Sequence, residues 1–199
     1  MKRNIVKVAI ALLVGIVMLA ACSSDKGPAE LAIKAAEEAV NASKAEAAKY
    51  VPEELKSLEG ALAAVKDNFA KKEYKAAIAD AQALAGKAKD LLGAANAKKE
   101  ELTKSWTDLS EGLPKMVGAI QSRVDILSKS KKLPANLTAE KFTEVKSGLA
   151  AAQEEWGKAM ESFKAGNIAE AVSAANSVKG KAVSAMETLG MPVPAGAKS

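Results

Sequence analysis

The sequence contains no histidine and a single cysteine, Cys22, in 199 residues. These absences exclude an intrachain disulfide, a zinc site built from His and Cys, and a His-based catalytic triad. Aromatic residues make up only 4% of the chain. The sequence also lacks a Gly-rich phosphate loop, a G-x-S-x-G nucleophile motif and metal-ligand spacings. We therefore expect no enzymatic activity, no metal site and no cofactor.

The basic excess of the chain is small once its N-terminus is set apart. The formal charge is +5 and the pI is about 9.1. Three basic residues and no acidic ones lie in residues 1–21, so the chain from Cys22 onward has 26 basic and 24 acidic residues, or +2. Only Arg123 among these 26 is an arginine, the side chain best suited to phosphates and bases. Nucleic acid is not expected as a partner.

Residues 1–21 have the order of a targeting signal. Lys2, Arg3 and Lys7 come first, and an apolar run follows from Val8 to Ala21. At about 14 residues this run is shorter than the roughly 20 that cross a bilayer. The run ends in a leucine, two small residues and the cysteine, Leu19-Ala20-Ala21-Cys22. This stretch closely resembles the signal peptide and lipobox of bacterial lipoproteins.

The resemblance implies a lipid anchor at Cys22. In that family the cysteine thiol receives a diacylglycerol, the signal is cleaved before the cysteine, and two or three acyl chains hold the protein stably on a membrane. Residues 22–27 would then link the lipid to the fold. Asp commonly follows the cysteine in lipoproteins retained in the inner membrane, whereas Ser23 stands here. We expect the periplasmic face of the outer membrane, with the inner or cytoplasmic membrane as the alternative. An uncleaved helical anchor with an incidental cysteine is the other interpretation.

The remainder of the chain has a helical pattern. The sequence contains 43 alanines, and its larger apolar residues recur at spacings of three and four without period-2 runs. This pattern predicts an all-α fold of antiparallel hairpins in an elongated, coiled-coil-like bundle over residues 28–189. The first helix should end before Pro52. Residues 190–199, rich in Pro, Gly and Ala, are expected to form a flexible tail.

Two predicted hairpins are related by an offset of 94 residues. The first has helices that start at Pro52 and Tyr74, joined at Lys71-Lys72, and the second joins residues 142–163 and 168–189. Seven of 41 positions are identical between residues 55–95 and 149–189. The shared phase and turn position favour an internal duplication, and two independently amphipathic hairpins are the alternative.

The segment between the hairpins continues the apolar stripe from Leu102 to Leu127, with Gly112 and Pro114 inside it. Because proline removes a helical hydrogen bond, the segment is either a kinked long helix or two helices that meet near residues 111–114. Residues 128–136 are expected to form a loop. Its lysines are either a solvated surface or a contact for anionic lipid or cell-wall polymer: Lys129, Lys131 and Lys132.

Further resemblances are local. The entry Tyr50-Val51-Pro52-Glu53-Glu54-Leu55, a heptad helix and the turn Lys72-Glu73-Tyr74 resemble small Ala-rich helical domains of uncharacterised envelope lipoproteins, which implies a fold and a location but no activity. The turn with Phe163, Gly166, Asn167, Glu170 and Ala171 resembles a tetratricopeptide helical pair, although that family repeats near every 34 residues. The end Lys198-Ser199 resembles lipoproteins linked to peptidoglycan through a C-terminal lysine, but here a serine follows.

The aromatic residues lie on or continue the apolar stripes, so core packing is their expected role. Trp106, beside the break at Gly112, and Trp156 are alternatively partner contacts. The sequence thus predicts a non-enzymatic, lipid-anchored envelope protein that contacts another envelope protein or peptidoglycan. The alternative is a helical binding module for a peptide, an apolar ligand or a cell-wall polymer.

Overall fold

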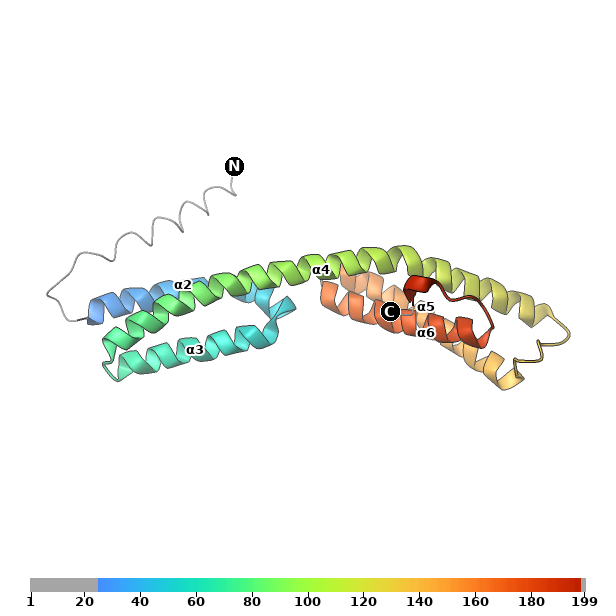
Figure 1. The fold of residues 1–199 in the computed structure, drawn as a ribbon, viewed down its shortest axis with the longest axis horizontal. Helices are drawn as coiled ribbons and strands as arrows, with labels where there is room; N and C mark the ends of the chain where they lie inside the picture. Colours follow the sequence, from blue (N-terminus) through green and yellow to red (C-terminus); the bar gives the residue numbers. More distant parts are fainter. Residues whose placement is uncertain (1–24, 198–199) are drawn as a thin grey trace, which may run out of the picture. The chain divides into compact units, whose positions relative to one another are not determined.

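The structure, a computed structural model, describes residues 25–197. It contains the long helices α2 (Lys26–Tyr50), α3 (Pro52–Ala70), α4 (Tyr74–Lys129), α5 (Ala139–Lys164) and α6 (Ile168–Thr188), and a short 3-10 helix η1 (Ala195–Ala197) (Figure 1). No strand occurs between residues 25 and 197, and the predicted all-α helical fold is confirmed. The predicted signal sequence, with its lipobox Leu19–Cys22, lies outside the described residues.

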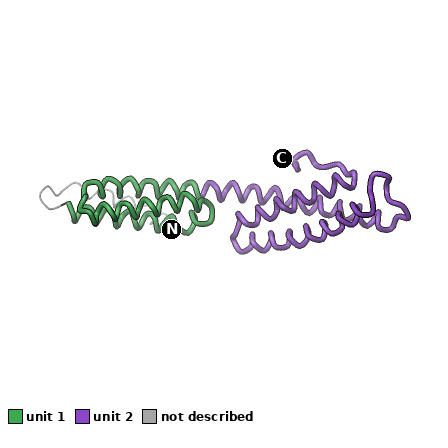
Figure 2. The backbone as a smooth tube through the Cα atoms, turned by 90° about the horizontal axis from the view of Figure 1, so that it is seen from below, with its two compact units in different colours: residues 1–95 green, residues 96–199 purple. Residues whose placement is uncertain are grey.

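The chain divides into two compact units, residues 1–95 (unit 1) and 96–199 (unit 2) (Figure 2). Unit 1 contains α2, α3 and the first part of α4, and unit 2 contains the rest of α4, α5, α6 and the C-terminal segment. The sequence predicts one domain over residues 28–189. The division falls between Ala95 and Asn96, inside a helix, so no loop, proline or polar linker marks it in the sequence.

Helix α4 passes through Pro114 without a break. Of the two alternatives left by the sequence, the structure therefore has the single long helix. Pro114 is exposed, whereas its neighbours Leu113 and Met116 are 2% and 7% exposed in the core. Burial of Leu113 and Met116 holds the backbone helical, and Pro114, which cannot donate to the carbonyl of Ser110 one turn earlier, lies on the exposed side of the helix.

The core of unit 1 combines a helix of small residues with two helices of larger ones. Helix α2 buries a stripe of residues at spacings of three and four: Ala36, Val40, Ser43, Ala47 and Tyr50. The hydroxyl of Ser43 is satisfied because its Oγ donates to the Val40 carbonyl at 2.9 Å. Opposite this thin face, α3 and α4 contribute bulkier buried side chains: Leu55, Leu58, Val65, Leu84 and Leu91.

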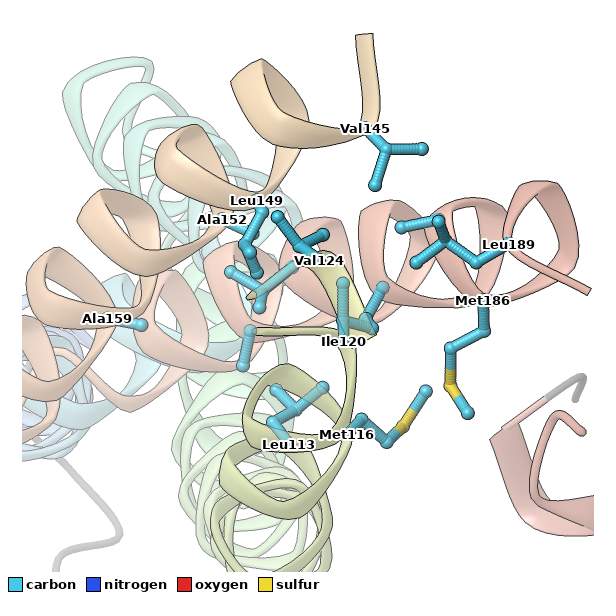
Figure 3. Packing of buried hydrophobic residues seen from close by; sticks show 14 of the residues in the cluster. Leu113, Met116, Ile120, Val124, Val145, Leu149, Ala152, Ala159, Met186 and Leu189 are labelled. Atoms are coloured by element: carbon cyan, nitrogen blue, oxygen red, sulfur yellow. The ribbon is translucent and has the colours of Figure 1, made fainter. Parts of the chain in front are cut away.

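In unit 2 the helix equivalent to α2 carries large side chains in place of small ones. Here α4 contributes the bulky residues Trp106, Leu113, Ile120 and Val124. Helices α5 and α6 contribute six buried alanines and an equal number of larger residues: Phe142, Val145, Leu149, Val172, Val178 and Met186. Figure 3 labels some of these residues, among them Leu149, Ala152 and Met186. Close packing needs large residues opposite small ones, and three bulky positions of the first hairpin are alanines in the second: Leu58/Ala152, Val65/Ala159 and Leu91/Ala185.

The turns of the two hairpins share one backbone geometry at the predicted offset of 94. Helices α3 and α5 end 94 residues apart, and so do the starts of α4 and α6. The amide of Lys71 donates to the Asp67 carbonyl at 3.0 Å, and Ala165 donates to Glu161 at 2.9 Å. Lys72 (φ 65°) and Gly166 (φ 81°), again 94 apart, are both left-handed.

The repeat extends to the cores. All nine buried residues between Leu55 and Ala95 have a buried counterpart 94 positions later. Five of the six buried residues of α2 have a buried counterpart at an offset of 77, in the second part of α4: Ala29/Trp106, Ala36/Leu113, Ser43/Ile120, Ala47/Val124 and Tyr50/Leu127. The two offsets differ by 17 residues because unit 2 has additional residues at this point, in the loop 130–138 and in the helical turns beside it. These matches favour duplication of a three-helix unit.

Candidate functional site

An open groove of about 640 Å³ lies in unit 2 between α4, α6 and the C-terminal segment. Its apolar lining comes from all three elements: Leu109, Leu113, Met116, Ala119, Met186, Pro194 and Ala197. A smaller hollow of about 170 Å³ lies between α3 and α4 of unit 1 and is lined by small, apolar and charged residues: Ala61, Ala64, Val65, Asp80, Ala83, Leu84 and Lys87. The groove of unit 2 is therefore the larger candidate for a ligand site.

The C-terminal segment is directed to the groove by the end of α6. The amide of Gly190, at φ 65°, donates to the Glu187 carbonyl at 3.1 Å, and the amide of Met191 donates to Met186 at 2.8 Å. This left-handed ending turns the chain away from the helix axis. Met191, Val193 and Ala197 then pack against the unit 2 core. Residues 190–197, expected from the sequence as a flexible tail, thus form one wall of the groove.

Gly112 leaves space in the groove wall. No heavy atom lies within 4 Å of the position that a Cβ would take there. The polar lining consists of the uncharged Ser105 and Asn176 and of charged residues of both signs: Asp108, Lys115 and Lys179. A mainly apolar lining with a few polar groups is typical of ligand sites, and two methionines make it adaptable. The sequence identified Gly112 only as a helix interruption, and nothing in it indicated that the C-terminal segment would pack nearby.

The two tryptophans proposed as partner contacts lie in one aromatic stack. Trp106 is 7% exposed. Its ring lies 4.5 Å from that of Phe163 at 9° and 5.4 Å from that of Trp156 at 13°. Trp156 and Phe163 are half-buried and pack against the same core. The stack joins α4 to α5, and only Trp156 and Phe163 leave appreciable surface for a partner.

The charged residues near the stack form structural pairs. Glu155 on α5 accepts hydrogen bonds from Lys181 and, at 3.1 Å, from Ser177 on α6. The Lys181 hydrogen bond is the main cause that lowers the pKa of Glu155. On the exposed face of α5, Lys158 donates to Glu154 at 2.6 Å, which lowers the pKa of Glu154 and raises that of Lys158. The pairs that involve Glu155 tie α5 to α6.

The other predicted residues lie apart from the groove. Lys129, Lys131 and Lys132 are exposed where α4 ends and the following loop begins. Residues 25–197 contain no cluster of three or more Cys, Asp or Glu side chains that would hold a metal ion. None of the helices in this range is long and apolar enough to cross a bilayer.

No family model, curated protein or solved structure matches the chain.

Proposed function

We propose that this chain is a non-enzymatic lipoprotein of the bacterial cell envelope, held on the periplasmic face of the outer membrane by acyl chains on Cys22. Its helical units would serve a structural or protein-interaction role, with another envelope protein or peptidoglycan as the partner. The bundle consists of helices with apolar cores and solvated charge pairs, an architecture suited to supporting contact surfaces.

The sequence Leu19-Ala20-Ala21-Cys22, after a basic start and an apolar run, carries this proposal. The only cysteine of the chain stands at the one position where a lipobox requires it. Helix α2 begins at Lys26, four residues after Cys22. The proposed anchor and the first helix are therefore separated only by a short polar segment.

Metabolic labelling with palmitate, followed by mass spectrometry of the N-terminal peptide, tests the anchor. We expect label in the wild-type chain and none in Cys22→Ala. The matched variant Ser23→Asp should stay lipidated but move from the outer-membrane to the inner-membrane fraction. Label that persists in Cys22→Ala would contradict the anchor. Unchanged fractionation of Ser23→Asp would contradict the outer-membrane assignment alone.

The groove of unit 2 favours a second candidate, a helical binding module. Its lining of Leu109, Leu113, Met116 and Met186 suits an apolar ligand better than a cell-wall polymer, whose sugars need many hydrogen bonds. A peptide with apolar side chains is the other ligand that this lining would suit. Affinity would come from the apolar surface that the ligand removes from water.

A fluorescent fatty acid tests this second function. We expect saturable binding that Gly112→Leu abolishes, because a Cβ at this position meets no neighbour and the larger side chain would extend into the groove. Gly118→Leu is the matched control, since Gly118 is exposed on the same helix, has equal room and does not line the groove. Absence of saturable binding, or an equal loss in both variants, would remove an apolar ligand as the occupant.

A further inference from the structure

Leu31 on α2 is 69% exposed, the largest value among the exposed large hydrophobic side chains of the described chain. It lies on the side of α2 opposite the buried residues Ala29 and Ala36, about 200° around the helix from Ala29 at 100° per residue. Packing within unit 1 therefore does not account for it. Lys34, one turn further along the same side, makes no ion pair with the residues that the structure describes.

Unit 2 shows that the three-helix frame does not require these residues. At the offset of 77 that relates α2 to the second part of α4, Leu31 corresponds to Asp108 and Lys34 corresponds to Glu111. Asp108 and Glu111 are both exposed, and Asp108 also lines the groove of unit 2. Equivalent positions thus carry an apolar and a basic residue in unit 1 and two acidic residues in unit 2. This difference points to a surface chemistry that only unit 1 needs.

The distance along the chain places Leu31 close to the proposed anchor. Three residues lie between Cys22 and Lys26, so the two Cα atoms are at most about 14 Å apart even when the chain is fully extended. Five further residues of helix add about 8 Å. Leu31 is therefore within about 22 Å of the Cα atom of Cys22 in any arrangement, close enough to reach the lipid headgroups that surround the acyl chains.

We propose that the first turns of α2, with Leu31 and Lys34 at their centre, form a surface that rests on the phospholipid bilayer. This proposal rests on the lipid anchor at Cys22. Leu31 enters the interface between headgroups and acyl chains, while the ammonium of Lys34 remains at the level of the phosphates, as lysine does at membrane surfaces. Glu38 lies on the same side one turn beyond Lys34 and is exposed, so the contact ends before it.

A fluorescent reporter at Ala35 tests the contact without changing either residue of the proposed surface. Because lipidation consumes the Cys22 thiol, Ala35→Cys in the full-length lipidated protein supplies the only thiol for an environment-sensitive dye. The protein is reconstituted in vesicles of phosphatidylethanolamine and phosphatidylglycerol that contain spin-labelled lipid. Ala48→Cys, exposed near the other end of α2, and Ile126→Cys, 59% exposed in unit 2, are the reporter controls.

We expect spin-labelled lipid to quench the dye at position 35 strongly and the dyes at 48 and 126 weakly. The double variant Leu31→Asp with Lys34→Glu gives unit 1 the residues that unit 2 has at the equivalent positions, so it should fold. It should lower the ratio of contacting to detached protein about tenfold, since a largely exposed leucine gains on the order of 1.4 kcal/mol in an apolar environment. Circular dichroism checks that the helices remain.

The outcomes separate the two proposals. Two dyes per chain by mass spectrometry would mean that Cys22 is free, and the anchor and the contact would both fall. One dye per chain with equal quenching at positions 35, 48 and 126 would overturn the contact and leave the anchor standing. Strong quenching at position 35 that the double variant leaves unchanged would also overturn the assignment to Leu31 and Lys34.

Discussion

Replacement of Trp106 by alanine should destabilise unit 2 strongly. The side chain is 7% exposed and stacks on both Phe163 and Trp156. Truncation of a buried tryptophan to alanine removes apolar contacts and leaves a cavity, at about 4 kcal/mol. The two ring contacts on Trp106, each worth about 1 kcal/mol beyond burial, place the expected loss at the upper part of the usual range. A large part of the stability of a domain would thus be lost through one residue.

Urea denaturation followed by tryptophan fluorescence measures this loss. Both tryptophans lie in unit 2, so Trp156 still reports on that unit in the variant. Ile126→Ala on the same helix is the control and should change the unfolding free energy by less than about 0.5 kcal/mol, because Ile126 is 59% exposed. A loss below about 1 kcal/mol for Trp106→Ala would refute the burial argument and return Trp106 to the role of a surface contact.

Three further predictions concern the turns and the charge pairs. Lys72 has a left-handed backbone at φ 65°, so Lys72→Gly should stabilise unit 1 by about 1 kcal/mol, measured by thermal unfolding. Gly166→Ala at φ 81° should destabilise unit 2 by about 1 kcal/mol, and a gain in stability would contradict the duplicated turn geometry. The hydrogen bond from Lys181 lowers the pKa of Glu155 below its ordinary value of 4.5, so this pair stabilises the fold above pH 4.5 and loses its effect as the pH falls through the lowered pKa. The difference in stability between wild type and Glu155→Gln should therefore shrink as the pH falls below 4.5, and a constant difference in acid denaturation would contradict the pairing.

The sequence predicted most of the helical layout because few residues interrupt the helical periodicity. The turn at Gly166, the end of the first helix before Pro52 and the buried stripe of α2 follow from local rules. The continuity through Pro114 could not be decided locally, because tertiary burial of Leu113 and Met116 opposes the effect of the proline. The sequence did not reveal the repeat at offset 77, because α2 and the second part of α4 have buried residues at equivalent positions but few residue types in common.

The candidate groove was missed for a related reason. The sequence marks Gly112 and the segment 190–197 as breaks, and breaks are ordinarily read as loops or flexible ends. Only the fold shows that the chain turns at Gly190 and brings Pro194 and Ala197 near Gly112. The contact depends on residues about 80 positions apart, and local pattern carries no information about such a pairing.

Comparison of the two units distinguishes the residues that the three-helix fold requires from the residues that only one unit has. Both units bury the same register of positions, yet α2 contributes mostly small side chains in unit 1, whereas the second part of α4 contributes mostly bulky ones in unit 2. Such exchanges of volume keep a core filled without conserving any residue. The surface difference between Leu31 in unit 1 and Asp108 in unit 2 is not balanced by an exchange of volume within either unit. Differences of this second kind, which the cores do not explain, are where the functional differences between the units should be sought.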